Sequence, residues 1–166
     1  MNETALQQAA QKNQIDFVYY FLTKKEKIEK QSFINCDKMT KIVIPANITI
    51  IEDCSFKGCS SLKQVLIPSS VTAIGKSAFK NCVSLKEINI PTSVVSIQSK
   101  AFSNCCLLMR ITIPSSITSI ENKLFSKCTN LIEVSIPSSV TYIGIKAFSN
   151  CSNLKEIKIP SSVSEI

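Results

Sequence analysis

Residues 56–82 read FKGCSSLKQVLIPSSVTAIGKSAFKNC, a stretch that begins and ends on the same fragment, Phe-x-x-Cys. The interval of 23 residues between these fragments recurs through most of the chain. It spaces phenylalanine at Phe33, Phe56, Phe79, Phe102, Phe125 and Phe148, and cysteine at Cys36, Cys59, Cys82, Cys105, Cys128 and Cys151. A unit of this length cannot bury an apolar side alone, so we expect the units to stack as coils with like residues above one another. The sequence therefore predicts a repeat solenoid.

Each coil carries its own pattern of short elements. The L-x-x-V-x-I run of residues 62–67 has the spacing of a leucine-rich repeat. Its apolar residues alternate with Gln64 and Leu66, which is the period of a half-buried strand. We expect a second short extended side at residues 71–74 and a tight helical turn at residues 77–79. The coil is thus predicted to be β-rich, with short helical turns.

The repeating cysteines, called the cysteine ladder below, are interpreted as buried structural thiols, since cysteine is small, apolar and a weak S–H donor. Stacked coils lie about 4.7–4.9 Å apart, whereas a disulfide needs Cβ atoms nearer about 3.8 Å, so disulfides along the ladder are not expected. The chain has no histidine and no Cys-x-x-Cys pair, so we expect neither a metal nor another cofactor. Cys54 and Cys106 lie off the ladder and are expected to be the thiols most open to oxidation.

The consensus I-P-S-S-V-T-x-I-G-x-x-A-F-x-N-C-S-x-L-K-x-I-x-I-P, which extends over residues 28–166, resembles the BspA-like leucine-rich repeats. These repeats occur in surface-antigen and adhesion-associated families of bacteria and parasitic protists. The resemblance implies a leucine-rich repeat solenoid of the right-handed α/β superhelix type. It also implies a binding or adhesion scaffold, and it brings no catalytic residues to carry over.

Residues 4–22, TALQQAAQKNQIDFVYYFL, lie outside the period and resemble the helix pair of one ankyrin repeat. The residues expected to face inward are Leu6, Ala9 and Ala10 from the first helix, and Phe17, Val18, Phe21 and Leu22 from the second. Asn13 stands where the ankyrin turn has glycine. We expect residues 1–27 to form a helical cap, ahead of an array of about six coils over residues 28–166 whose last coil is incomplete. A partner-binding helix pair is the alternative.

The outward residues of the predicted strands vary from coil to coil while the core rows do not, so we predict that they bind a protein partner. This strand face comprises Lys41, Gln64, Leu66, Glu87, Asn89, Arg110, Thr112, Glu133, Ser135, Glu156 and Lys158. It has neither an aromatic stripe nor a single sign of charge, which argues against nucleic acid. The net charge of +7 is dispersed along the sequence and predicts solubility better than a nucleic-acid partner. No apolar run approaches the ~20 residues that insert into a bilayer.

Two other functions stay open. A purely structural array, or a fragment of a longer surface antigen, is one of them. A hydrolase that uses the neighbouring carboxylates of Glu133 and Glu156 is the remote alternative, because the absence of histidine excludes histidine-dependent triads. We expect the chain not to be an enzyme.

The sequence gives conflicting indications of the cellular location of the protein. The polar start, residues 1–14, lacks the apolar core of a secretory signal and favours the cytoplasm, while the family resemblance favours a cell surface, with a host or self surface protein as the partner.

The repeat stops at Ile166, midway through a coil. We therefore expect either a longer array or self-association through the open C-terminal end.

Overall fold

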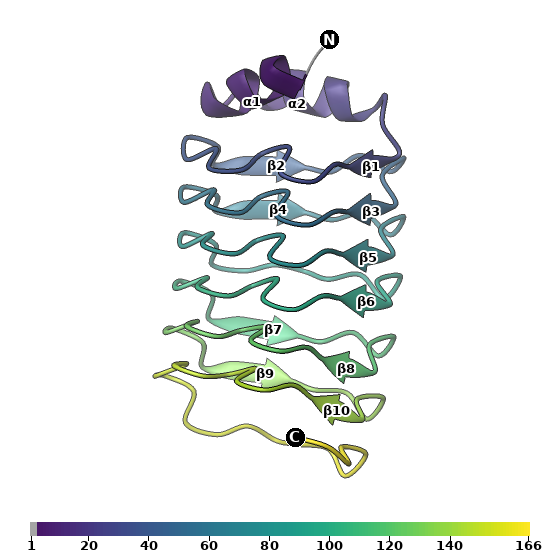
Figure 1. Ribbon diagram of the computed structural model, residues 1–166, viewed down its shortest axis with the longest axis vertical. Coiled ribbons are helices and arrows are strands. Elements are labelled where there is room, and N and C mark those ends of the chain that lie inside the picture. Colours follow the sequence, from purple (N-terminus) through teal and green to yellow (C-terminus); the bar gives the residue numbers. More distant parts are fainter. Residues whose placement is uncertain (1–2) are drawn as a thin grey trace.

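The computed structural model describes residues 3–166 as a stack of coils with two helices lying across its N-terminal end (Figure 1). The predicted fold class, a leucine-rich repeat solenoid with a helix pair at its start, is confirmed. Most coils contribute one or two short parallel strands and a run of turns. One continuous apolar core extends from the helices through the stack.

The helices α1 (Glu3–Gln11) and α2 (Ile15–Leu22) are joined by a turn in which Asn13 has a φ of 54°. The side chains of Leu6, Ala9, Ala10, Val18 and Leu22 are buried, and Phe21 packs partly against the core. The prediction for Phe17 is wrong, because its side chain is 38% exposed. The buried face of α2 follows Val18 and Leu22, four positions apart, and Phe17 lies about 100° around the helix from Val18.

Several polar contacts fix the helix pair on the first coil. The Asn13 Oδ1 atom accepts a hydrogen bond from the Thr40 backbone N–H at 3.0 Å. The Gln11 Nε2 atom donates to the Asn35 carbonyl oxygen at 2.8 Å. Below α2, the Asn47 amide donates to the Leu22 carbonyl oxygen at 2.8 Å and also contacts the Lys25 carbonyl oxygen. The helix end and the coil thus satisfy backbone groups that would otherwise lack partners.

The strands pair in parallel across successive coils. One side of the solenoid carries β1 (Lys27–Ile28), β3 (Ile50–Ile51), β5 (Ala73–Ile74) and β6 (Ser96–Ile97) in one sheet, followed by β8 (Ser119–Ile120) and β10 (Tyr142–Ile143) in another. The other side carries the pair β2 (Lys41–Val43) and β4 (Gln64–Leu66), then the pair β7 (Arg110–Thr112) and β9 (Glu133–Ser135). In every pair, the partners are residues 23 positions apart.

The phenylalanines of the repeat form a second ladder inside the turns. Consecutive rings stack with centroids 5.0–5.7 Å apart and planes within 12° of parallel. From the Phe33 ring to the Phe125 ring they are fully buried. Their backbone N–H groups donate to carbonyls of the next coil, as from Phe79 to Ala101 at 2.8 Å. On the turn side, main-chain hydrogen bonds and side-chain packing together hold successive coils against each other.

The cysteine ladder lies beside these rings. From Cys59 onward, each thiol lies 3.0–3.3 Å from the phenylalanine carbonyl oxygen of the coil before it, and donates its proton there. All eight cysteines are free. Burial raises the pKa of Cys36 to about 11 and that of Cys128 to about 12, and it raises the pKa values of the other ladder thiols too. The ladder is therefore a set of neutral donors in the core.

The turn residues adopt a left-handed backbone twice per coil. The residue before each ladder cysteine has a φ of 55–79°. Lys127 belongs to this row, although a lysine side chain disfavours a left-handed backbone. A second position, four residues earlier, is left-handed in every coil from Gln31 to Lys146. Ser77 belongs to this second row, with a φ of 56°, so residues 77–79 form consecutive i→i+3 turns rather than a helix.

Candidate functional site

The strand face lies over a buried row. In β2, β4, β7 and β9 the central residue faces the core, while the residues on either side of it point outward. Gln64, Leu66, Arg110, Thr112, Glu133 and Ser135 are exposed, and Lys41 is half-buried. Because strand side chains alternate between faces, the buried row fixes which side chains reach solvent.

Four residues of the strand face lie outside the strands of the structure. Glu87 and Asn89 stand at the matching position of the next coil, as do Glu156 and Lys158 further along. All four are exposed, but their backbone segments do not join either strand pair. The predicted face is therefore continuous in position, while its hydrogen-bonded sheet is interrupted between β4 and β7 (Figure 1).

Opposite charges meet at one point of the strand face. Arg110 and Glu133 are register partners on β7 and β9, and the Arg110 Nε atom lies 3.1 Å from the Glu133 Oε2 atom. Both side chains are largely exposed, at 71% and 65%, so this pair contributes little to stability, at most about 1 kcal/mol. Its charges are available to a partner.

Two shallow depressions mark this surface. One of about 360 Å³ lies over the interrupted segment and is lined by Gln64, Leu66, Glu87, Asn89 and Arg110, among others. The other, of about 370 Å³, is lined by Ile132, Glu133, Ser135, Glu156 and Lys158, among others. Both are open and mixed in polarity, as is typical of a surface that contacts a macromolecule.

The carboxylates of Glu133 and Glu156 share the second depression. Both side chains are exposed, and that of Glu133 pairs with Arg110. Catalytic carboxylates usually lie in a cleft that shields them from solvent, whereas these two lie on an open surface. Within residues 3–166, no group of three histidine, cysteine, aspartate or glutamate side chains gathers as a metal site.

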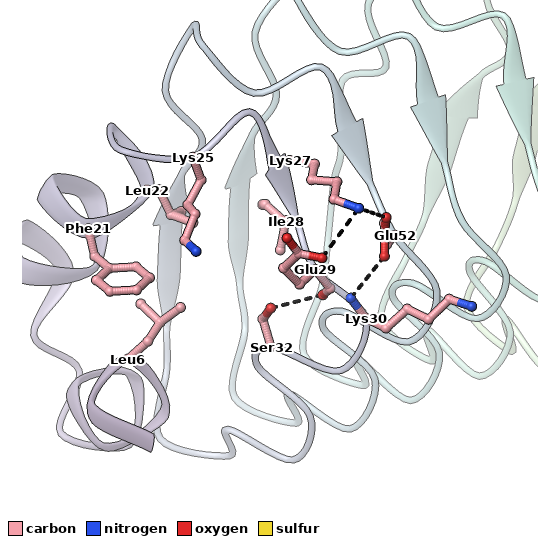
Figure 2. A pocket seen from close by; sticks show the side chains of 10 residues that line it. All are labelled: Leu6, Phe21, Leu22, Lys25, Lys27, Ile28, Glu29, Lys30, Ser32 and Glu52. Carbon is pink, nitrogen blue, oxygen red and sulfur yellow. Dashed lines mark hydrogen bonds and ion pairs between the residues drawn. The ribbon is translucent and has the colours of Figure 1, made fainter. Parts of the chain in front are cut away.

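A third hollow, which sequence reasoning missed, lies where the helix pair meets the first coil. It has a volume of about 410 Å³, with Leu6, Phe21 and Leu22 on the helix side. Figure 2 shows Lys27 reaching between Glu29 and Glu52 on the opposite side, at 3.4 Å and 2.6 Å. The hydrogen bond between Lys27 and Glu52 raises the pKa of the ammonium and lowers that of the carboxyl.

The charges of this hollow therefore largely neutralise each other. The sequence signal was the mixed run of residues 24–30, which contains both lysines and glutamates. That run contains β1 at the start of the first coil, and the hollow therefore lies at the boundary between the helices and the coils.

Comparison with protein families gives a match to the BspA type leucine rich repeat region, in six copies over residues 26–128 and 61–166. Comparison with curated proteins gives no match. A leucine-rich cell surface protein from Faecalibacterium prausnitzii is 39% identical, with a TM-score of 0.79, over 84% of this chain and 38% of that one. A leucine-rich repeat protein from Bacteroides ovatus is 30% identical, with a TM-score of 0.70, over 82% of this chain and 42% of that one.

A leucine-rich repeat protein from T. pallidum is 26% identical, with a TM-score of 0.61, over 76% of this chain and 70% of that one. The chain thus spans about two-fifths of the length of the F. prausnitzii and B. ovatus proteins. Neither helix of the described chain has the length or apolar character of a membrane span. Proteins of this fold are generally non-enzymatic scaffolds. The profile match, the shared architecture and the repeat of 23 residues together show that the chain belongs to the BspA-type leucine-rich repeat family.

Proposed function

We propose that the chain is a non-enzymatic scaffold that binds a protein partner through its strand face. One observation carries this proposal: the outward side chains of β2, β4, β7 and β9 change from coil to coil above a buried row that stays aliphatic. Packing requires the buried row and leaves the outward row free. A surface that is free to vary, exposed and mixed in charge has the character of a recognition surface.

The chemistry of the face favours a folded protein as the partner. It combines an exposed aliphatic residue, Leu66, at 45% exposure with lysine, arginine, glutamate and neutral polar residues. Alternating charges such as Arg110 and Glu133 favour a partner whose surface charges are complementary in order, and they repel a protein whose charges are not.

A cell-surface location, with a host or self surface protein as the partner, fits this proposal best. The F. prausnitzii protein, which shares 39% of its aligned residues with this chain, is described as a cell surface protein. The comparisons give no support to the cytoplasmic location that the polar start of the sequence favoured.

The test compares two charge-neutral double variants. Arg110→Gln with Glu133→Gln removes the ion pair of the strand face. Lys30→Gln with Asp53→Asn removes an exposed ion pair elsewhere, whose atoms lie 3.9 Å apart, and keeps the side-chain oxygen that accepts the Lys76 N–H. Surface proteins are captured from detergent extracts on the immobilised chain, and the captured protein is purified and titrated.

We expect one saturable partner whose affinity falls with the strand-face variant and stays unchanged with the control variant. Equal loss in both variants would place the site elsewhere. No saturable partner in any extract would favour the purely structural array. Hydrolase activity that disappears in Glu133→Gln would instead favour the enzyme.

A further inference from the structure

A groove on the turn side gathers five of the chain's 19 lysine and arginine residues. It has a volume of about 470 Å³ and crosses four successive coils. Its lining consists of lysine, asparagine and serine alone, with the lysines Lys80, Lys100, Lys123, Lys127 and Lys146. We call this surface the lysine groove. It shares no residue with the strand face.

The stacking of coils aligns three of these lysines. Lys100, Lys123 and Lys146 occupy the same position of consecutive coils, with φ values of 60°, 56° and 58°. They lie on the same three successive coils as Phe102, Phe125 and Phe148, whose rings stack at 5.6–5.7 Å. The groove therefore presents a line of positive charge along the solenoid axis.

Within residues 3–166, these lysines form no ion pair with a carboxylate. The ion pairs among residues 3–166 use Lys27, Lys30 and Arg110, so none includes a lysine of the groove. No carboxylate lines the groove either. The groove thus holds only neutral polar side chains and ammonium groups, and the ammonium groups repel one another until an anion binds.

The fold does not require lysine at these positions. Earlier coils carry Gln31, Cys54 and Ser77 in the same left-handed row, all without charge. A left-handed backbone favours asparagine or glycine, so three consecutive lysines contradict the local preference. Three consecutive lysines that are unfavourable for the backbone and also repel one another indicate a function.

We propose that the lysine groove binds an anionic polysaccharide that lies along the solenoid axis. Lysines repeated at one per coil match a polymer with regularly spaced acidic groups, and the asparagine and serine side chains offer hydrogen bonds to its hydroxyl groups. The lining has no aromatic side chain on which a base could stack, which disfavours single-stranded nucleic acid. It also has no apolar side chain to enter a bilayer, which disfavours an anionic membrane.

This inference goes beyond the proposed protein partner, because it concerns a separate surface and another class of ligand. Failure of one leaves the other standing. Binding at the lysine groove is expected to be strongly dependent on salt, since it rests on charge and counterion release.

The test uses dextran sulfate as the probe, with neutral dextran, oligo(dT) and phosphatidylserine vesicles as alternatives. The groove variant combines Lys100→Asn, Lys123→Asn and Lys146→Asn, since asparagine tolerates the left-handed backbone. The control variant combines Lys63→Asn, Lys86→Asn and Lys155→Asn, three exposed lysines in another row of the repeat. Both variants remove the same charge.

We expect the dissociation constant for dextran sulfate to rise roughly tenfold or more in the groove variant and less than about twofold in the control variant. The dependence of binding on salt should also weaken in the groove variant alone. Equal losses in both variants would overturn the proposal, because they would reflect net charge. Tighter binding of oligo(dT) or of the vesicles at the groove would also overturn it. If the triple variant fails to fold, Lys123→Asn alone must show a loss that the matched Lys86→Asn does not.

Discussion

Replacing Phe102 by alanine tests the central ladder of the core most directly. Its side chain is fully buried, and its ring stacks on Phe79 at 5.5 Å and on Phe125 at 5.7 Å. A buried phenylalanine truncated to alanine costs about 3–5 kcal/mol of unfolding free energy, and each aromatic contact contributes about 0.5–1.5 kcal/mol beyond its burial. Because two ring contacts are lost together, we expect a loss at the upper end of this range, about 5 kcal/mol.

The matched control is Phe148→Ala, at the end of the same ladder. Phe148 is half-buried and has one ring neighbour, Phe125 at 5.6 Å, so its truncation should cost about 2 kcal/mol. Urea unfolding followed by far-ultraviolet circular dichroism measures both losses. Since a solenoid can unfold in parts, the comparison holds only where the urea dependence is unchanged. Equal losses, or a loss below about 2 kcal/mol for Phe102→Ala, would contradict the assignment of Phe102 to a fully buried ring stacked on both sides.

Three further outcomes follow from the turns. Gly144→Ala should cost about 1–3 kcal/mol by urea unfolding, because a Cβ there meets the Asn122 backbone nitrogen at 2.6 Å, whereas Gln98→Ala in the same row should cost under about 0.5 kcal/mol. Lys127→Asn should stabilise the protein by about 1 kcal/mol in the same assay, since asparagine suits a φ of 65° better; a loss would contradict this. In the native protein at pH 8, a thiol reagent should label Cys54 and Cys106 first, and mass spectrometry should find the ladder thiols protected until unfolding.

The periodicity predicted the coils because stacking imposes the same demand on every repeat. A position that is buried in one coil is buried in the next, so aliphatic and aromatic rows in the sequence became core rows in the structure. The family resemblance and the fold class were therefore within reach of the sequence alone. The turn chemistry was partly visible too, in asparagines such as Asn81 and Asn104, whose φ values are 64° and 63°.

Contacts between different positions of the repeat were harder to predict. The second serine of each Ile-Pro-Ser-Ser run donates its hydroxyl to a carbonyl of the preceding coil, as from Ser70 to Ile48 at 2.7 Å and from Ser162 to Val140 at 2.7 Å. The regular recurrence of this serine was a signal of the hydrogen bond between coils. Serine is also common in solvated turns, however, so the signal was not specific. Other coils have Glu52, Gln98 and Glu121 at the position of Gly75, so the sequence does not show that a Cβ on Gly75 would meet the Asp53 backbone nitrogen at 2.6 Å.

The lysine groove escaped the sequence for the same reason. Lys80 and Lys127 belong to other positions of the repeat than Lys100, Lys123 and Lys146, so the row of three lysines in the sequence shows only part of the groove. Summed along the chain, their charge looked like a dispersed basic excess. Only the coil geometry brings all five lysines to one groove.

The two candidate surfaces differ in what they can recognise, and this follows from how each is built. The strand face alternates in charge, so salt screens its attractive and repulsive contacts together, and its specificity rests on shape and on pairs such as Arg110 and Glu133. The lysine groove has one sign of charge, so salt removes its attraction and leaves little else. A chain of this kind can therefore hold a polymer loosely and a protein specifically at the same time. Raising the salt concentration from about 0.05 M to about 0.5 M should release dextran sulfate while the protein partner stays bound, because the Debye length shrinks to a few ångström. Release of both ligands together would mean that the strand face, too, binds through net charge.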